Sequence, residues 1–198
     1  MRVKNFSTIA VLSAIICSVS GIVTPVRSEE RCSLPTLPGI DVSKVRIVKN
    51  ATSRDRSIEQ YIRKEHENAD AINSGMTASY SYNKVDLDGD GKPEVLLRVS
   101  SPLCGTGGCP IEILKFNGNR YSVINSFLSF GDYIFTSNKT NGFKDMILPY
   151  VRPMENKYLL LKYQSSAKGY TQVGEYTNNL KVKGMAYLVC GESFALSK

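Results

Sequence analysis

The residues of this sequence best suited to chemistry are four acids gathered in one short stretch. Val85-Asp-Leu-Asp-Gly-Asp-Gly-Lys-Pro-Glu94 places Asp86, Asp88 and Asp90 at alternate positions and closes with Glu94. Carboxylates this close together repel one another unless a cation lies between them. Calcium takes about six to eight hard oxygen ligands, so the stretch predicts a calcium site.

The spacing of these acids follows the template of a calcium-binding loop, with Gly91 at the sharp turn in its sixth position. The twelfth position holds Leu97 where the template has a bidentate glutamate, so we expect weak affinity, with Kd roughly 10⁻⁴ to 10⁻³ M. The alternative is a solvated turn, because Asp and Gly are common turn formers. The predicted ligands are Asp86, Asp88, Asp90, the backbone carbonyl of Lys92, and Glu94.

The loop runs directly into the apolar residues Val95-Leu-Leu97, so its flanks are expected to be strands and not helices. In this respect the stretch from Asp86 to Glu94 resembles the strand-loop-strand calcium loops of FG-GAP and VCBS-type repeats. Those repeats occur many times around a β-propeller, whereas this chain carries the motif once. The resemblance therefore implies a calcium loop with its two strands, and no overall fold.

Residues 1–28 have the features of an export signal. Positive charges close to Met1 are followed by a short apolar run that ends near Val23. Serine and glycine interrupt this run, which is shorter than the roughly 18 apolar residues of a spanning helix; an uncleaved membrane anchor is the alternative. Cleavage after Ser28 would leave residues 29–198 as a single domain, and a cut near Gly21 is the competing site.

The charge of the chain after cleavage is mildly positive. Removal of the signal takes away Arg2, Lys4 and Arg27 and no acid, which lowers the formal charge from +7 to +4. The basic residues form no long run, so the sequence indicates neither binding to nucleic acid nor a polybasic contact with a membrane. We expect a periplasmic or secreted protein that has no membrane span after cleavage and a protein partner in the envelope or outside the cell.

Four cysteines remain after the signal, and an even number in an exported chain predicts two disulfides. Three pairings are open, and we favour Cys104 with Cys109 and Cys32 with Cys190. The glycines between Cys104 and Cys109 permit a tight closed loop, and the second bridge would tie the start of the domain to its end. Zinc is the less favoured alternative, because His66 is the only histidine.

The periodicity of apolar residues predicts an α+β to mainly β domain: an antiparallel meander sheet or sandwich with one packed N-terminal helix. The helix is expected over residues 53–67, with Ser53 or Ser57 as its cap. Strand-like alternation then continues to the end of the chain. The expected strands cover residues 78–85, 95–100, 111–116, 121–127, 133–136, 143–150, 158–164, 170–176 and 185–189.

No catalytic constellation is evident, because nucleophilic catalysis usually places Ser or Cys beside a histidine. We therefore expect an exported non-catalytic binding module, held by a calcium ion and two disulfides, such as one that binds or inhibits a secreted or envelope enzyme. The alternative is a carboxylate-dependent hydrolase acting on envelope polymer. Its candidate acids are Glu112, Asp132, Asp145, Glu155 and Glu175.

Overall fold

The fold is taken from a computed structural model of the chain. It describes residues 40–65, 78–101, 104–106, 108–129, 133–149, 158–176, 180–187 and 193–196. Its elements are β1 (Ile40–Val48), α1 (Arg56–Glu65), β2 (Ala78–Val85), β3 (Glu94–Ser100), β4 (Cys109–Phe116), β5 (Tyr121–Ser129), β6 (Tyr133–Thr140), β7 (Phe143–Pro149), β8 (Tyr158–Gln164), β9 (Gly169–Tyr176), β10 (Leu180–Tyr187) and β11 (Phe194–Leu196).

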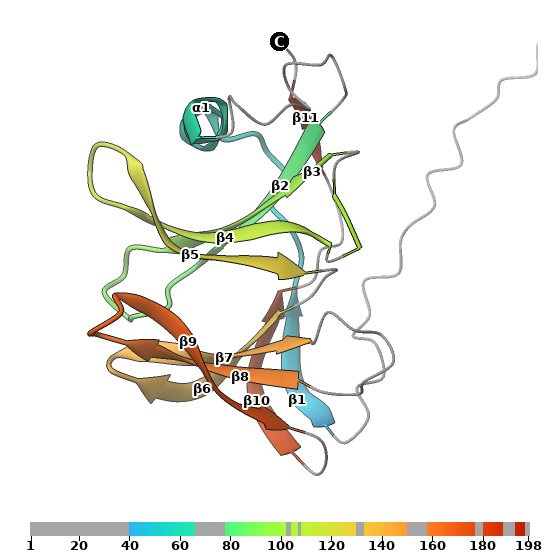
Figure 1. Cartoon of the computed structure of the whole chain (residues 1–198), viewed down its shortest axis with the longest axis vertical. Coiled ribbons are helices and arrows are strands. Elements are labelled where there is room, and N and C mark those ends of the chain that lie inside the picture. Colours follow the sequence, from blue (N-terminus) through green and yellow to red (C-terminus); the bar gives the residue numbers. More distant parts are fainter. Residues whose placement is uncertain are drawn as a thin grey trace, which may run out of the picture.

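The strands form two sheets that lie one above the other, with α1 on the far side of the upper sheet (Figure 1). The upper sheet has five strands in the order β11-β2-β3-β4-β5, and the lower has six in the order β1-β10-β6-β7-β8-β9. Strands β2 to β5 form one antiparallel meander and β6 to β9 another, because short turns can join only antiparallel neighbours. The expected mainly β architecture with one helix is thus present.

The main core fills the space between the two sheets. Strands alternate their side chains between the two faces, so each sheet can bury one face against the other. The upper sheet contributes Leu96 and Ile113, and the lower sheet contributes Phe135 and Met146, all of them nearly free of solvent contact. Leu87, from the loop between β2 and β3, lies fully buried in the same cluster and so anchors that loop in the core.

Helix α1 covers the outer face of the upper sheet. Ile58, Tyr61 and Ile62 lie on one side of the helix and pack against aromatic and aliphatic side chains of β2 to β4. The helix is capped by Asp55, whose Oδ1 accepts hydrogen bonds from the amides of Ser57 at 3.0 Å and Ile58 at 3.3 Å. This corrects the expected serine cap. The helix also begins at Arg56 and not at Ser53.

All nine expected strands are present, but several bounds and two further strands differ from the expectation. β6 continues to Thr140 and β10 begins at Leu180, while β1 and β11 were not anticipated. β1 pairs with β10 in parallel, so the lower sheet is mixed and not wholly antiparallel. The pairing of β1 shifts register between Asp41 and Lys44, and this irregularity breaks the alternation that would have marked the strand.

Residues 1–28, the predicted export signal, lie outside the described residues, as do His66, Asp132 and Glu155. Within the described part of the chain, no helix has the length and apolar character that crossing a membrane would require.

Candidate metal site

The acidic stretch forms the loop between β2, which ends at Val85, and β3, which begins at Glu94. Asp86, Asp88 and Glu94 converge there: each offers a carboxylate oxygen, and these three oxygens lie within 4.8 Å of one another. Oxygens that share a neighbourhood of this size can contact one cation of calcium size, whose bonds to oxygen measure about 2.3 to 2.6 Å.

Local hydrogen bonds set the curvature of the loop. The two carboxylate oxygens of Asp86 accept from the amides of Gly89 at 2.7 Å and Gly91 at 3.3 Å, and Oδ1 of Asp88 accepts from the amide of Asp90 at 3.0 Å. Aspartate side chains commonly fold the backbone in this way. Gly89 and Gly91 have φ angles of +88° and +81°, a region that residues with a Cβ adopt only with strain.

Glu94 is the most deeply placed of the acids, with no exposed surface. Its Oε2 accepts a hydrogen bond from the amide of Leu87 at 2.9 Å, whereas its Oε1 has only the ammonium group of Lys115 nearby among the described residues, at 3.2 Å and without regular hydrogen-bond geometry. Burial raises the pKa of Glu94 above its usual range, although the Leu87 amide and Lys115 act in the opposite direction. The contacts of Glu94 therefore do not fully offset the free-energy cost of burying its charged form.

Lys115, at the end of β4, directs its ammonium group into this cluster. Its Nζ donates a hydrogen bond to Oδ2 of Asp88 and lies 3.2 Å from Oε1 of Glu94 and 3.4 Å from Oδ2 of Asp90. The hydrogen bond to Asp88 raises the pKa of Lys115 above its ordinary value. For Asp88, burial is the largest single influence and opposes ionisation, but the hydrogen bonds from Lys115 and from the amide of Asp90, together with the charge of Lys115, outweigh it and lower the pKa.

Two further lysines tie the loop to the lower sheet. Lys139 of β6 donates from Nζ to the carbonyl of Asp88 at 2.9 Å, and Lys144 of β7 donates from Nζ to the carbonyl of Asp86 at 2.8 Å. The backbone amide of Lys144 also donates to the carbonyl of Leu87 at 2.9 Å. The acidic loop is thus a point at which the two sheets are joined.

One of the predicted carboxylate ligands lies outside the converging group. Asp90 is not among the three acids that converge, and its Oδ1 accepts from the amide of Lys92 at 2.7 Å. Lys92 itself is exposed. Lys115 was not among the residues predicted from the sequence, although the antiparallel pairing of Val95 with Leu114 brings the next residue of β4 close to Glu94. The register of a predicted hairpin could have indicated this contact.

Cys104 and Cys109 form a disulfide, as predicted from the glycines between them. Within the bridged loop the amide of Gly108 donates to the carbonyl of Gly105 at 3.0 Å, and Gly108 has a φ of +90°. The tight turn therefore uses a conformation that glycine adopts readily. The predicted partners Cys32 and Cys190 lie outside the described residues.

The acids of the alternative hydrolase hypothesis do not all approach one another. Glu112 is buried under α1 on the outer face of the upper sheet, where the hydroxyl of Tyr61 donates to its Oε2 at 2.9 Å. Asp145 is buried on β7 beside Ile147, which belongs to the apolar cluster on the outer face of the lower sheet. These two carboxylates face opposite sides of the molecule and cannot act together.

Comparison with known proteins gives no match: no family model fits the sequence, and neither a curated protein nor a solved structure is significantly similar to it.

Proposed function

We propose that the loop from Asp86 to Glu94 binds a calcium ion, and that the ion takes the place of the Lys115 ammonium group. The convergence of three carboxylate oxygens within 4.8 Å is the observation that carries this proposal. Asp90, which lies at the edge of the cluster, and the carbonyl of Lys92 are the two further ligands that the loop template adds.

Replacement of Lys115 by calcium is favoured by charge and by the position of the lysine. Asp86, Asp88 and Glu94 carry three negative charges when ionised. Lys115 contacts the carboxylates of Asp88 and Glu94, whereas the ammonium groups of Lys139 and Lys144 bond backbone carbonyls of the loop. The Lys115 side chain is 36% exposed, so its flexible stem can move into solvent. Displacing it costs its hydrogen bond to Asp88, which together with the absent twelfth ligand accounts for the weak affinity that we expect.

The ion in this proposal stabilises the fold and takes no part in a reaction. The loop that it orders contacts Lys139 and Lys144 of the lower sheet and carries the buried Leu87, so a bound ion reinforces the junction of the two sheets. We propose that the whole domain is an exported, non-catalytic binding module, stabilised by calcium and by disulfides.

The surface offers a place for a protein partner. Val123 and Leu128 on β5 and Val173 on β9 are exposed by 47%, 56% and 46%. β5 and β9 are edge strands of their sheets and lie next to each other, since the Asn125 side chain donates to the carbonyl of Tyr170 at 3.0 Å. Apolar side chains exposed on edge strands are typical of contact surfaces.

Calorimetric titration with CaCl2 tests the calcium proposal. We expect one site with Kd roughly 10⁻⁴ to 10⁻³ M, no comparable response to MgCl2, and loss of binding in Asp88→Asn. Asp41→Asn is the matched control, because Asp41 is an exposed aspartate on β1 outside the loop. Absence of a calcium response in the unaltered protein would overturn the proposal. For the partner surface, Leu128→Lys should abolish any specific capture from envelope extract that the unaltered protein shows.

A further inference from the structure

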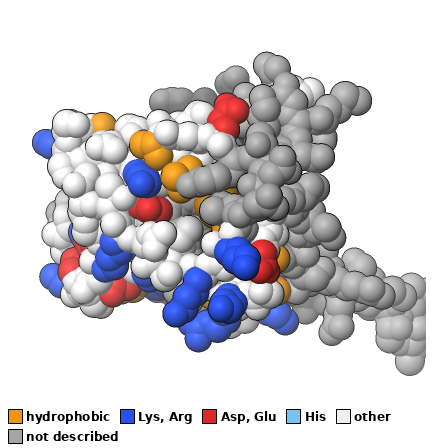
Figure 2. Space-filling view, turned by 90° about the horizontal axis from the view of Figure 1, so that it is seen from below, with side chains coloured by type: hydrophobic (Ala, Val, Ile, Leu, Met, Phe, Trp, Pro, Cys, Tyr) orange, Lys and Arg blue, Asp and Glu red, His pale blue; other side chains and the backbone are white. Residues whose placement is uncertain are grey.

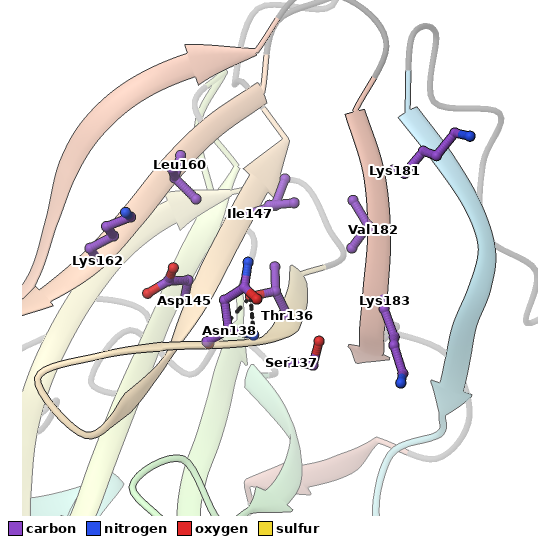
Figure 3. A pocket seen from close by; sticks show the side chains of 10 residues that line it. All are labelled: Thr136, Ser137, Asn138, Asp145, Ile147, Leu160, Lys162, Lys181, Val182 and Lys183. Atoms are coloured by element: carbon purple, nitrogen blue, oxygen red, sulfur yellow. Dashed lines mark hydrogen bonds between the residues drawn. The ribbon is translucent and has the colours of Figure 1, made fainter.

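A pocket of about 200 Å³ lies on the lower sheet and shares no residue with the acidic loop. Strands β6, β7, β8 and β10 contribute the side chains that line it (Figure 3). Pockets for drug-sized molecules measure roughly 300 to 1,000 Å³, so this one suits a smaller ligand. No part of the calcium proposal bears on it.

The pocket exists because β6 bulges out of the sheet between Phe135 and Lys139, where it loses its regular pairing with β7. β10 pairs with β6 from Gly184, opposite Thr136, onward to Tyr187, and the pairing of β6 with β7 shifts register between Phe135 and Lys139. The hydroxyl of Thr136 bonds the displaced segment, accepting from the amide of Asn138 at 3.2 Å. The opening between this segment and the first residues of β10 is therefore built into the backbone (Figure 3).

Asp145 is the decisive side chain of the pocket. It is only 5% exposed, and its buried Oδ1 has no hydrogen-bond partner among the residues that the structure describes. A buried carboxylate without a partner destabilises a fold, so such a group in the wall of a pocket indicates a ligand that donates a hydrogen bond to it. Figure 3 shows Asp145 beside Asn138 and Lys162.

The remaining lining combines positive charge with an apolar floor. Lys162, Lys181 and Lys183 line the pocket together with Asp145, the one acid in the lining. Lys162 lies beside Asp145, whereas Lys181 and Lys183 extend from the side of β10 opposite Val182 (Figure 3). Figure 2 looks onto this side of the molecule and shows basic side chains gathered on it. Ile147 and Val182 belong to the apolar cluster beneath.

We propose that this pocket binds a small organic anion that also carries a hydroxyl or ammonium donor. The donor bonds Oδ1 of Asp145, the carboxylate of the ligand is attracted by Lys162, and the carbon skeleton lies on Ile147 and Val182. Hydroxy acids and amino acids of this size share that chemistry. A ligand without the donor would leave Asp145 unpartnered, and a ligand without the anion would leave the positive charge unbalanced.

Calorimetry with four probes tests the proposal on the whole protein. D-glucuronate carries hydroxyl donors and a carboxylate, L-glutamate carries an ammonium donor and carboxylates, glutarate lacks the donor, and D-glucose lacks the anion. We expect glucuronate or glutamate to bind at least about tenfold more tightly than glutarate or glucose. The one of the two that binds identifies the donor as hydroxyl or ammonium.

Variants then connect the binding to the pocket. Asp145→Asn should weaken the preferred probe about tenfold and remove its advantage over glutarate. Glu65→Gln should change neither, because Glu65 is exposed on α1, on the far side of the upper sheet. Leu160→Phe, which narrows the pocket without altering charge, should also abolish binding, and it serves if Asp145→Asn does not fold. Failure of all four probes to bind, equal binding of glutarate, or undiminished binding in Leu160→Phe would overturn the proposal.

Discussion

The Nζ atom of Lys115 lies 3.2 Å from Oε1 of Glu94, a carboxylate that has no exposed surface. The two residues come from adjacent strands, β4 and β3, and their contact places a protein cation where the loop template places a metal ion. The lysine therefore acts as an internal counter-ion of the acidic loop. This relationship leads to predictions in which the lysine and calcium compete for the same oxygens.

Replacing Lys115 by Met should lower the stability of the calcium-free protein and raise its affinity for calcium. Without the ammonium group the acids repel one another, and calcium no longer has to displace a bound cation. Thermal melting at several CaCl2 concentrations measures both effects. Lys64→Met is the control, because Lys64 is exposed on α1 and, within the described part of the chain, forms an ion pair with Glu65 alone, at 3.5 Å. Unchanged calcium affinity in Lys115→Met would contradict the competition.

Neutralising Glu94 and neutralising Asp88 should have opposite effects on the calcium-free protein at neutral pH. The pKa of Glu94 is raised, so its ionised form disfavours the folded state, and Glu94→Gln should melt at the same or a higher temperature. The pKa of Asp88 is lowered by Lys115, so Asp88→Asn should melt at a lower temperature. Both variants should lose the response to calcium.

The pH dependence of the stability of these two variants tests the direction of each pKa shift. A group with a raised pKa in the folded state favours folding below its unfolded pKa, so the difference between Glu94→Gln and the unaltered protein should vanish as the pH falls below 4.5. For Asp88 the stabilisation is present above 3.8 and is lost as the pH falls further. Urea unfolding at several pH values between about 3 and 7 would measure both effects. A stability advantage of Glu94→Gln that grew towards low pH would reject this assignment.

The two glycines of the loop provide a matched pair. Gly91→Ala should cost about 1 kcal/mol of stability from backbone strain alone, because an added Cβ there meets no atom within 4 Å. Gly89→Ala should cost about 1 kcal/mol more, because its Cβ would lie 2.7 Å from Nζ of Lys139 and displace that group from the carbonyl of Asp88. Chemical denaturation of both variants gives the difference. Equal losses would show that Lys139 contributes nothing to the junction of the sheets.

Removing the disulfide by replacing Cys104 and Cys109 with Ala should cost about 2 kcal/mol, the chain-entropy value for so short a loop. The calcium affinity should stay unchanged, because the bridge and the acidic loop share no residue. Denaturation and calcium titration of the double variant measure the two quantities separately. A weaker calcium site in this variant would indicate a coupling that the contacts do not explain.

The strands were largely predictable because alternation of apolar and polar residues is a local property. β1 was missed because its register shift between Asp41 and Lys44 breaks that alternation, and β11 because Phe194–Leu196 is too short to show a period. The division into two sheets and the parallel pairing of β1 with β10 depend on contacts between distant segments. No local pattern encodes them.

The candidate site likewise has residues that the sequence predicts and residues that only the folded structure reveals. Asp86, Asp88 and Glu94 could be grouped from the sequence because they lie within nine positions, and loop geometry alone brings them together. Lys139 and Lys144 reach the loop from the other sheet, so only the packing of the sheets reveals them. The pocket around Asp145 was likewise hidden, because it arises from the bulge of β6 between Phe135 and Lys139.

The most direct test of the account is a crystal structure grown with about 10 mM CaCl2, a concentration well above the expected Kd. We predict an anomalous peak about 2.3 to 2.6 Å from oxygens of Asp86, Asp88 and Glu94, with the ammonium group of Lys115 moved into solvent. Persistence of the Lys115 hydrogen bond to Asp88, with no peak between the acids, would show that the lysine is the permanent cation of this loop and that calcium has no place in it.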